Sequence, residues 1–174
     1  MRADPLYNTS IPWSHPSSWH AAQLSFNHHT ARLSSVRESL LPLAQNIELR
    51  LHAVAGQMKA LCARTCTYCP DPCCLKASVW YDFRELLGLH LYGKSLPMGQ
   101  PITNYGDICR YFSHSGCTLP RLIRPWICTW YICPVQARWL RTQPGEAGRN
   151  LDRALGQIKS RRSALEEKYI SVIY

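Results

Sequence analysis

The chain has 174 residues, of which 46% are hydrophobic and 18% charged, a composition typical of one folded domain rather than of a disordered chain. Its 20 Lys and Arg residues against 11 Asp and Glu residues give a formal net charge of +9, which permits an acidic partner without indicating one. No run approaches the roughly 18 apolar residues of a membrane span, and no apolar secretion core follows Met1. We therefore expect a cytoplasmic protein without a membrane partner.

The N-terminal part is predicted to be an arm followed by a long helix. Residues 1–25 are rich in proline, serine, histidine and tryptophan and show no apolar period, so we expect an irregular arm there. Over 32–61, apolar residues from Leu33 to Leu61 recur every three or four positions, the pattern of a helix buried along one face. Pro42 lies within this pattern and predicts either a kink or a later helix start.

Two further helices are predicted after the first cysteines. Residues 76–92 place apolar side chains on one helical face, and Gly93 supplies a stop. Residues 94–147 are divided by prolines and glycines into short segments without the alternation of strands. The last helix is predicted over 148–173. We expect the two long helices to pack as a hairpin within one chain; the same stripes could form a homodimeric coiled coil, and that alternative stays open.

Cysteine is the most informative residue type. All nine cysteines lie between Cys62 and Cys133. The odd count, the clustering and the expected lack of a secretion signal argue against a disulfide-stapled secreted protein. They favour metal ligation or redox chemistry in a reducing compartment.

The cysteines form two groups along the chain. In the first, Cys66 and Cys69 have the two-residue separation common in metal knuckles. The adjacent Cys73 and Cys74 are poorly placed for a disulfide because their Cα atoms are held about 3.8 Å apart. The second group is interleaved with aromatic residues, which we expect to exclude water from a metal centre. The predicted metal ligands are Cys66, Cys69, Cys73, Cys74, Cys109, Cys117, Cys128 and Cys133.

These eight sulfurs leave the metal undecided. They could build two Cys₄ zinc sites or one thiolate-bridged pair, or they could hold an iron–sulfur cluster, which Cys133 followed by Pro134 also fits. Cys62 directly follows Leu61 at the end of the helical stripe, and we expect a buried residue there rather than a ligand. Because the loops lack an apolar core of their own, metal is expected to be required for folding of residues 62–135.

The run 66–74 resembles the signature of the cysteine-cluster family named after its CxxCxxCC motif, which is described as a zinc- or iron-chelating domain. The resemblance extends over residues 62–135 and implies chelation of zinc or iron there. It departs from the family pattern because three residues, not two, separate Cys69 from Cys73, and because Cys62 is additional. The later features that follow the family's order are Cys109 with Tyr111 and Phe112, Gly116 before Cys117, Arg124 before Pro125, and Cys128.

The resemblance also implies an alternative function. Relatives include a flagellin lysine methylase, which suggests by analogy an iron–sulfur enzyme acting in electron transfer or in protein side-chain modification. No HExxH, GxSxG or Gly-rich phosphate loop occurs in the sequence, so no catalytic residue is identified and the question of an enzyme stays open. The arginines are scattered without a dense patch or a recognition helix, which argues against a nucleic-acid partner.

The sequence therefore predicts a mainly α fold, with long N- and C-terminal helices packed together around a loop-rich, metal-stabilised cysteine-cluster region. Residues 26–174 are expected to form a single helical domain, with its metal-binding core at 62–135. The predicted function is chelation of zinc, of iron or of an iron–sulfur cluster through cysteine thiolates. The expected partner is the metal ion or cluster, while a protein partner and a homodimer through the long helices are left open.

Overall fold

The computed structural model describes residues 10–32, 34–67, 69–114 and 116–173. The chain is mainly helical, which confirms the predicted fold class. Within the described ranges, no helix has the length and apolarity needed to span a lipid bilayer. In chain order the elements are α1 (Pro16–Arg32), α2 (Ser34–Thr65), η1 (Cys73–Leu75), α3 (Phe83–Leu91), β1 (Phe112–Ser113), β2 (Gly116–Cys117), η2 (Arg121–Ile123), α4 (Ile127–Trp130), α5 (Pro134–Thr142) and α6 (Ala147–Ile173).

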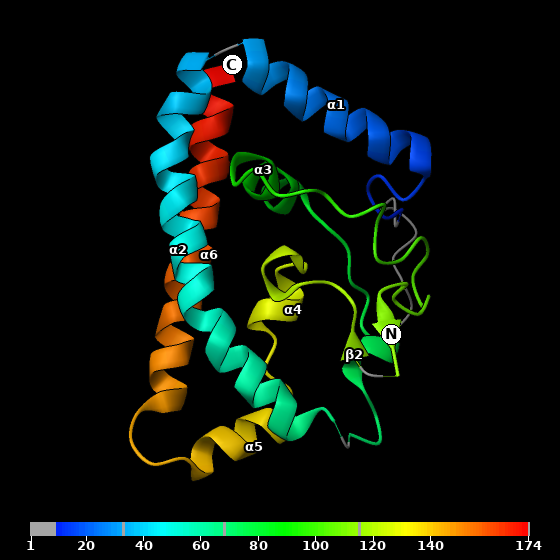
Figure 1. Ribbon diagram of the computed structural model, residues 1–174, viewed down its shortest axis with the longest axis vertical. Helices are drawn as coiled ribbons and strands as arrows, with labels where there is room; N and C mark the ends of the chain where they lie inside the picture. The colour runs from blue at the N-terminus through cyan, green and yellow to red at the C-terminus, as the bar shows by residue number, and fades with distance from the viewer. Residues whose placement is uncertain (1–9, 33, 68, 115, 174) are drawn as a thin grey trace.

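The two long helices, α2 and α6, lie side by side along the long axis of the molecule (Figure 1). Apolar residues spaced every three or four positions on both helices belong to one buried cluster. Ile47 and Met58 of α2, and Ile158 and Leu165 of α6, are almost completely buried. The predicted packing of the long helices within one chain is therefore confirmed. α2 continues through Pro42, so this proline does not mark a later start.

The prediction of an irregular arm over 1–25 is wrong for residues 16–25, which belong to α1. Trp19 and Phe26 are seven residues apart, or about two helical turns, and both are buried in the core cluster. Prolines and serines around this short apolar face concealed its period in the sequence. α1 extends at an angle away from the end of the α2–α6 pair where α2 begins and the C-terminus lies (Figure 1). Residues 1–9 of the predicted arm, and Leu33 of the predicted helical stripe, lie outside the described residues.

The helix predicted over 76–92 is shorter in the structure and begins only after Asp82. Asp82 and Glu85 form a capping box, in which each side chain accepts the backbone N–H of the other residue and so satisfies donors at the helix start. Tyr81 is fully buried although it is not helical, which explains why apolar residues suggested a longer helix. Gly93 has a φ of +65° and follows the end of α3 as predicted.

The segment between α3 and α6 consists of short elements, as predicted. β1 and β2 form an antiparallel hairpin of two residues per strand. α5 begins at Pro134, a favourable first helical residue because it has no N–H to leave unpaired. α5 packs against α2, and this contact brings the N-terminus of α5 to the C-terminal end of α2. Cysteines that are distant in sequence thereby become neighbours.

Candidate metal centre

The cysteines occupy the part of the molecule that contains the end of α2, the β hairpin, α4 and the start of α5 (Figure 1). All nine are free thiols, and each is half-buried or exposed. Cys62 belongs to α2, Cys66 and Cys69 follow it, Cys73 and Cys74 belong to η1, Cys109 precedes β1, Cys117 ends β2, Cys128 belongs to α4, and Cys133 caps α5.

Four thiols from three regions of the chain form a group that we call the hairpin set: Cys74, Cys109, Cys117 and Cys128. Every pair within this set interacts electrostatically, so a negative charge on one sulfur opposes ionisation of the others. Burial raises the pKa of Cys128 to about 12, and the charges of Cys117 and Cys109 add to this increase. Burial likewise raises the pKa of Cys109, with a further contribution from Cys117. A cation bound between the four sulfurs would reverse this repulsion.

The adjacent Cys73 and Cys74 share a hydrogen bond between their side chains. This bond lowers the pKa of Cys74 and raises that of Cys73. Cys73 also interacts electrostatically with Cys62. The pair therefore lies between the hairpin set and a second group of sulfurs.

The second group, which we call the helix-end set, consists of Cys62, Cys66 and Cys133, whose sulfurs contact Gln136, and of Cys73, whose charge interacts with those of Cys62 and Cys66. The Gln136 Nε2 atom lies 3.6 Å from Cys62 Sγ and 3.6 Å from Cys66 Sγ. The backbone N of Gln136 lies 3.5 Å from Cys133 Sγ, and its Oε1 accepts the N–H of Cys133 at 3.2 Å. Gln136 is only 5% exposed, so a buried residue joins three sulfurs from two helices.

Within the helix-end set, Cys62 is stabilised as a thiolate. A hydrogen bond from the Cys66 thiol lowers the pKa of Cys62, and the positive charge of Arg121 lowers it further. Arg121 Nη2 donates to Cys62 Sγ at 3.0 Å. The same guanidinium donates to the carbonyls of Met58 and Cys128, so it links the end of α2 to α4 as well as to the sulfur.

The structure places all eight predicted ligands around the end of α2, η1, the β hairpin, α4 and the start of α5. The N–H of Cys69 donates to the carbonyl of Cys66 at 3.2 Å. Within the described part of the chain, no hydrogen bond involves the Cys69 sulfur. Cys62, which the sequence analysis set aside as a buried residue, instead lies among the sulfurs. Because Cys62 directly follows the apolar stripe of α2, its contacts with Arg121 and Gln136 could not be predicted from its position in the sequence.

Gln136 and Arg121 are the residues that sequence reasoning missed. For Gln136 a signal was present: it stands three residues after Cys133, with Pro134 between them, which is the spacing of a capping box with cysteine in the place of serine. No comparable signal marks Arg121, since two of its partners, Met58 and Cys62, are 63 and 59 residues away in the sequence.

The surroundings of the sulfurs meet only part of the expectation of a dry metal centre. Tyr111 is buried, but Trp130 and Tyr131 are 44% and 41% exposed and pack edge to face against each other. Among the described residues, no group of three or more His, Cys, Asp or Glu side chains is arranged to hold a metal ion. Thiolate sulfurs are suitable ligands for a soft metal ion, but the sulfurs of each set would have to come closer to one another to coordinate one.

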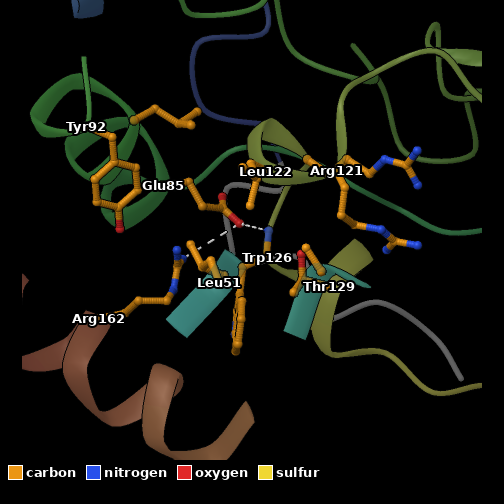
Figure 2. Close-up of a pocket in the computed structure, with 11 residues that line it drawn as sticks. Leu51, Glu85, Tyr92, Arg121, Leu122, Trp126, Thr129 and Arg162 are labelled. Atoms are coloured by element: carbon orange, nitrogen blue, oxygen red, sulfur yellow. Dashed lines mark hydrogen bonds and ion pairs between the residues drawn. The ribbon is translucent and has the colours of Figure 1, made fainter. Parts of the chain in front are cut away.

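A buried ion-pair network holds the segment that carries Cys128. Glu85 of α3 points between Trp126 and Arg162 (Figure 2), and its carboxylate accepts the N–H of Trp126. Arg162 Nη2 lies 3.8 Å from a Glu85 oxygen, and the Arg162 Cζ lies 5.1 Å from the centre of the Trp126 ring. Glu85 and Arg162 are each 7% exposed. These three residues line a cavity of about 20 Å³, which has room for one water molecule.

The charge on Glu85 is set by competing effects. Burial raises the pKa of this carboxyl to about 7, and the nearby Asp82 carboxylate contributes, while Arg162 and two backbone N–H donors oppose the shift. The network joins α3, α6 and the segment entering α4. Because Trp126 stands two residues before Cys128, the network also positions a member of the hairpin set.

Glu85→Gln is expected to flatten the dependence of stability on pH. The pKa of Glu85 is about 7 in the folded protein and 4.5 as the ordinary value, so between these values the folded state holds a proton that the unfolded chain has lost. The contribution of this group to stability is therefore largest at low pH and falls by about 3 kcal/mol as pH rises through 7. Urea unfolding at about pH 5 and pH 8 measures the difference. Equal pH dependence in both proteins would contradict the prediction.

Comparison with known proteins gives no match: no family model, no curated protein and no solved structure matches the chain. The resemblance to the cysteine-cluster family is thus carried by the motif alone.

Proposed function

We propose that this chain binds zinc or iron through its cysteine thiolates, as a metal-binding cysteine-cluster protein. The observation that carries the proposal is the hairpin set: η1, the β hairpin and α4 bring four free thiols into one part of the molecule (Figure 1), where burial and neighbouring thiolate charges raise the pKa of Cys109 and of Cys128. Gathering ionisable sulfurs in this way opposes their ionisation unless a cation compensates their charge. Thiolates are the ligands of structural zinc sites and of iron–sulfur clusters.

Two arginines beside the sets support an anionic centre. Arg121 donates directly to Cys62 Sγ at 3.0 Å. Arg124 donates to the carbonyls of Leu119 and Cys117, which places its charge at the exit of β2. A zinc ion held by four thiolates leaves a net charge of about −2 on the site. Neighbouring guanidinium groups would stabilise that charge.

We expect bound metal to stabilise the fold of the loops around the sulfurs, because these loops bury little apolar surface. Tyr105 and Ile108, close to Cys109, are 51% and 60% exposed, so this loop contributes little to the buried core. Metal binding would supply free energy that apolar packing does not provide there. Since the thiols are free and reduced thiols persist in the cytosol, the proposal includes a cytoplasmic location.

Metal analysis together with a UV–visible spectrum, on protein purified without oxygen, tests the proposal. We expect about two zinc or iron ions per chain if both sets close. A colourless zinc protein indicates structural sites. Iron with sulfide and absorption at roughly 400 nm indicates an iron–sulfur cluster and favours the enzyme alternative. A folded chain that contains no metal and takes up neither Zn²⁺ nor Fe²⁺ on titration would overturn the proposal.

A further inference from the structure

α5 has an exposed, positively charged face, at the end of the molecule where α2 ends and α6 begins (Figure 1). Arg138 and Arg141 are exposed about one helical turn apart, and Val135 is exposed one turn before them. The other side of this short helix is buried through Gln136. α5 contains no acidic residue, and within the described part of the chain no ion pair involves either arginine. Both charges are therefore available to an anionic partner.

α2 contributes a third arginine to the same end of the molecule. Arg64 is exposed in the last turn of α2, and its Cζ lies 5.5 Å from the centre of the Trp139 ring of α5. This cation–π contact holds the guanidinium against α5. Glu146, the acidic residue that follows α5, already pairs with Arg149 at 3.0 Å. The arginines are scattered along the sequence, but folding brings three of them to one surface with an excess of positive charge.

Two exposed aromatic side chains precede α5. Trp130 and Tyr131 are both exposed, and their ring centres are 6.2 Å apart in an edge-to-face arrangement. Aromatic side chains contribute most to a folded domain when they are buried, so this pair leaves ring surface available to a partner. Pro134, Val135 and Arg138 are exposed as well. The exposed surface therefore continues along the chain from the aromatic pair to the arginines.

Buried contacts fix both segments that carry this surface. α4, which ends at Trp130, is held by the hydrogen bond from Arg121 to the carbonyl of Cys128 at 3.0 Å. α5 is held through Gln136, whose Nε2 atom lies 3.6 Å from the sulfur of Cys62 on α2. A surface that is already ordered loses little conformational entropy when a partner binds.

We infer that Arg64, Trp130, Tyr131, Arg138 and Arg141, which we call the α5 surface, bind single-stranded nucleic acid. The arginines would contact phosphates and the aromatic rings would stack on bases, a combination that holds a single strand without reading its sequence. A single strand fits this surface better than an acidic peptide, because each nucleotide offers both a negative charge and a flat ring. The formal net charge of +9 favours the approach of such a polyanion. The inference does not depend on the proposed metal binding.

Fluorescence anisotropy of the full chain with a labelled oligouridine of about 15 nucleotides tests the inference. The wild type is expected to bind with a Kd of about 1–100 µM. The logarithm of its affinity should fall with the logarithm of salt concentration with a slope of about −2, because each phosphate contact of a single strand contributes about −0.7. Arg138→Ala is expected to weaken binding and to reduce the magnitude of this slope by about 0.7. A wild type that does not bind oligouridine at low salt overturns the inference.

Arg37→Ala is the matched control, since it removes an exposed arginine near the other end of α2. It changes the net charge by the same amount as Arg138→Ala and is expected to leave both the Kd and the slope unchanged. Equal weakening in the two variants would show that binding follows net charge alone, and this result would overturn the assignment to the α5 surface.

Trp130→Ala separates stacking on bases from attraction of charge. It is expected to raise the Kd at least about fivefold, because stacking of a base on an aromatic ring contributes about 1–3 kcal/mol, and to leave the salt slope unchanged. An RNA duplex and poly-glutamate, added at equal concentrations of charge, are expected to displace the labelled strand poorly, since neither offers unstacked bases. Wild-type affinity in Trp130→Ala, or equal displacement by either competitor, would show a general site for polyanions and overturn the inference.

Ultraviolet cross-linking of the unmutated chain to the same oligouridine does not depend on a variant folding. Mass spectrometry of the digested complex locates the peptides that carry a nucleotide. Cross-links are expected at Trp130 or Tyr131. Cross-links confined to other parts of the chain overturn the assignment.

Discussion

Glu85→Ala is expected to lower the free energy of unfolding by about 3–5 kcal/mol, because it leaves a buried charge without its partner. Glu85 accepts the backbone N–H groups of Asp82 and Trp126 and faces Arg162. Arg162 is 7% exposed, so bulk water solvates its charge poorly once the carboxylate is removed. The remaining ion pair of Arg162, to Asp82 at 3.6 Å, involves a carboxylate that is 48% exposed, so water screens that attraction. Urea unfolding followed by circular dichroism measures the loss.

Glu48→Ala provides the matched control. Glu48 also pairs with a cation, since Lys94 Nζ lies 2.7 Å from its Oε1. Both side chains of this pair are partly exposed, so removing the carboxylate is expected to cost about 1 kcal/mol or less. A loss in Glu85→Ala no larger than that in Glu48→Ala would show that the buried network does not hold the fold together.

The Glu85 network matters for the sulfurs because α4 is only four residues long and cannot hold its own position through helical hydrogen bonds. Its N-terminal end is fixed by the bond from Trp126 to Glu85. Its middle is fixed by Arg121, which donates to the carbonyl of Cys128 at 3.0 Å. Since Arg121 also donates to Cys62, a single guanidinium touches one residue of each cysteine set. The position of the sulfurs therefore depends on the helical core and on buried charges.

The periodic parts of the sequence predicted their own structure. The long apolar stripes predicted both main helices correctly, because a helix buried along one face has apolar residues with a period of 3.6 residues. The predicted helix over 76–92 was too long because the capping box of Asp82 and Glu85 starts α3 at Phe83. The apolar residues before Asp82 are therefore not helical. In α1 the apolar face was too short to stand out from prolines and serines.

The candidate site could be predicted as a group of cysteines but not as two sets. Chain spacing favoured Cys66 with Cys69, because a knuckle is a local feature that sequence displays directly. The grouping of Cys62 with Cys133 depends on how α5 docks against α2 and on the buried side chain of Gln136. Such contacts between distant segments arise from tertiary packing, which no local pattern records.

The second large effect expected is the loss of metal stabilisation in Cys128→Ser. A ligand present at about a thousand times its Kd raises the free energy of unfolding by about 4 kcal/mol when it binds only the folded state. Wild-type protein in excess Zn²⁺ should gain this amount from the hairpin set, and Cys128→Ser should lose it because only three of the four sulfurs remain. The two proteins are compared by urea unfolding with Zn²⁺ and with a chelator.

The chelator condition separates metal binding from packing. Without metal, replacing the half-buried Cys128 sulfur by a hydroxyl is expected to change stability by about 1 kcal/mol. Any further difference that appears only with Zn²⁺ belongs to the site. If Zn²⁺ raised the free energy of unfolding by the same amount in wild type and Cys128→Ser, Cys128 would not be a metal ligand. The proposal that the hairpin set binds metal would then be contradicted.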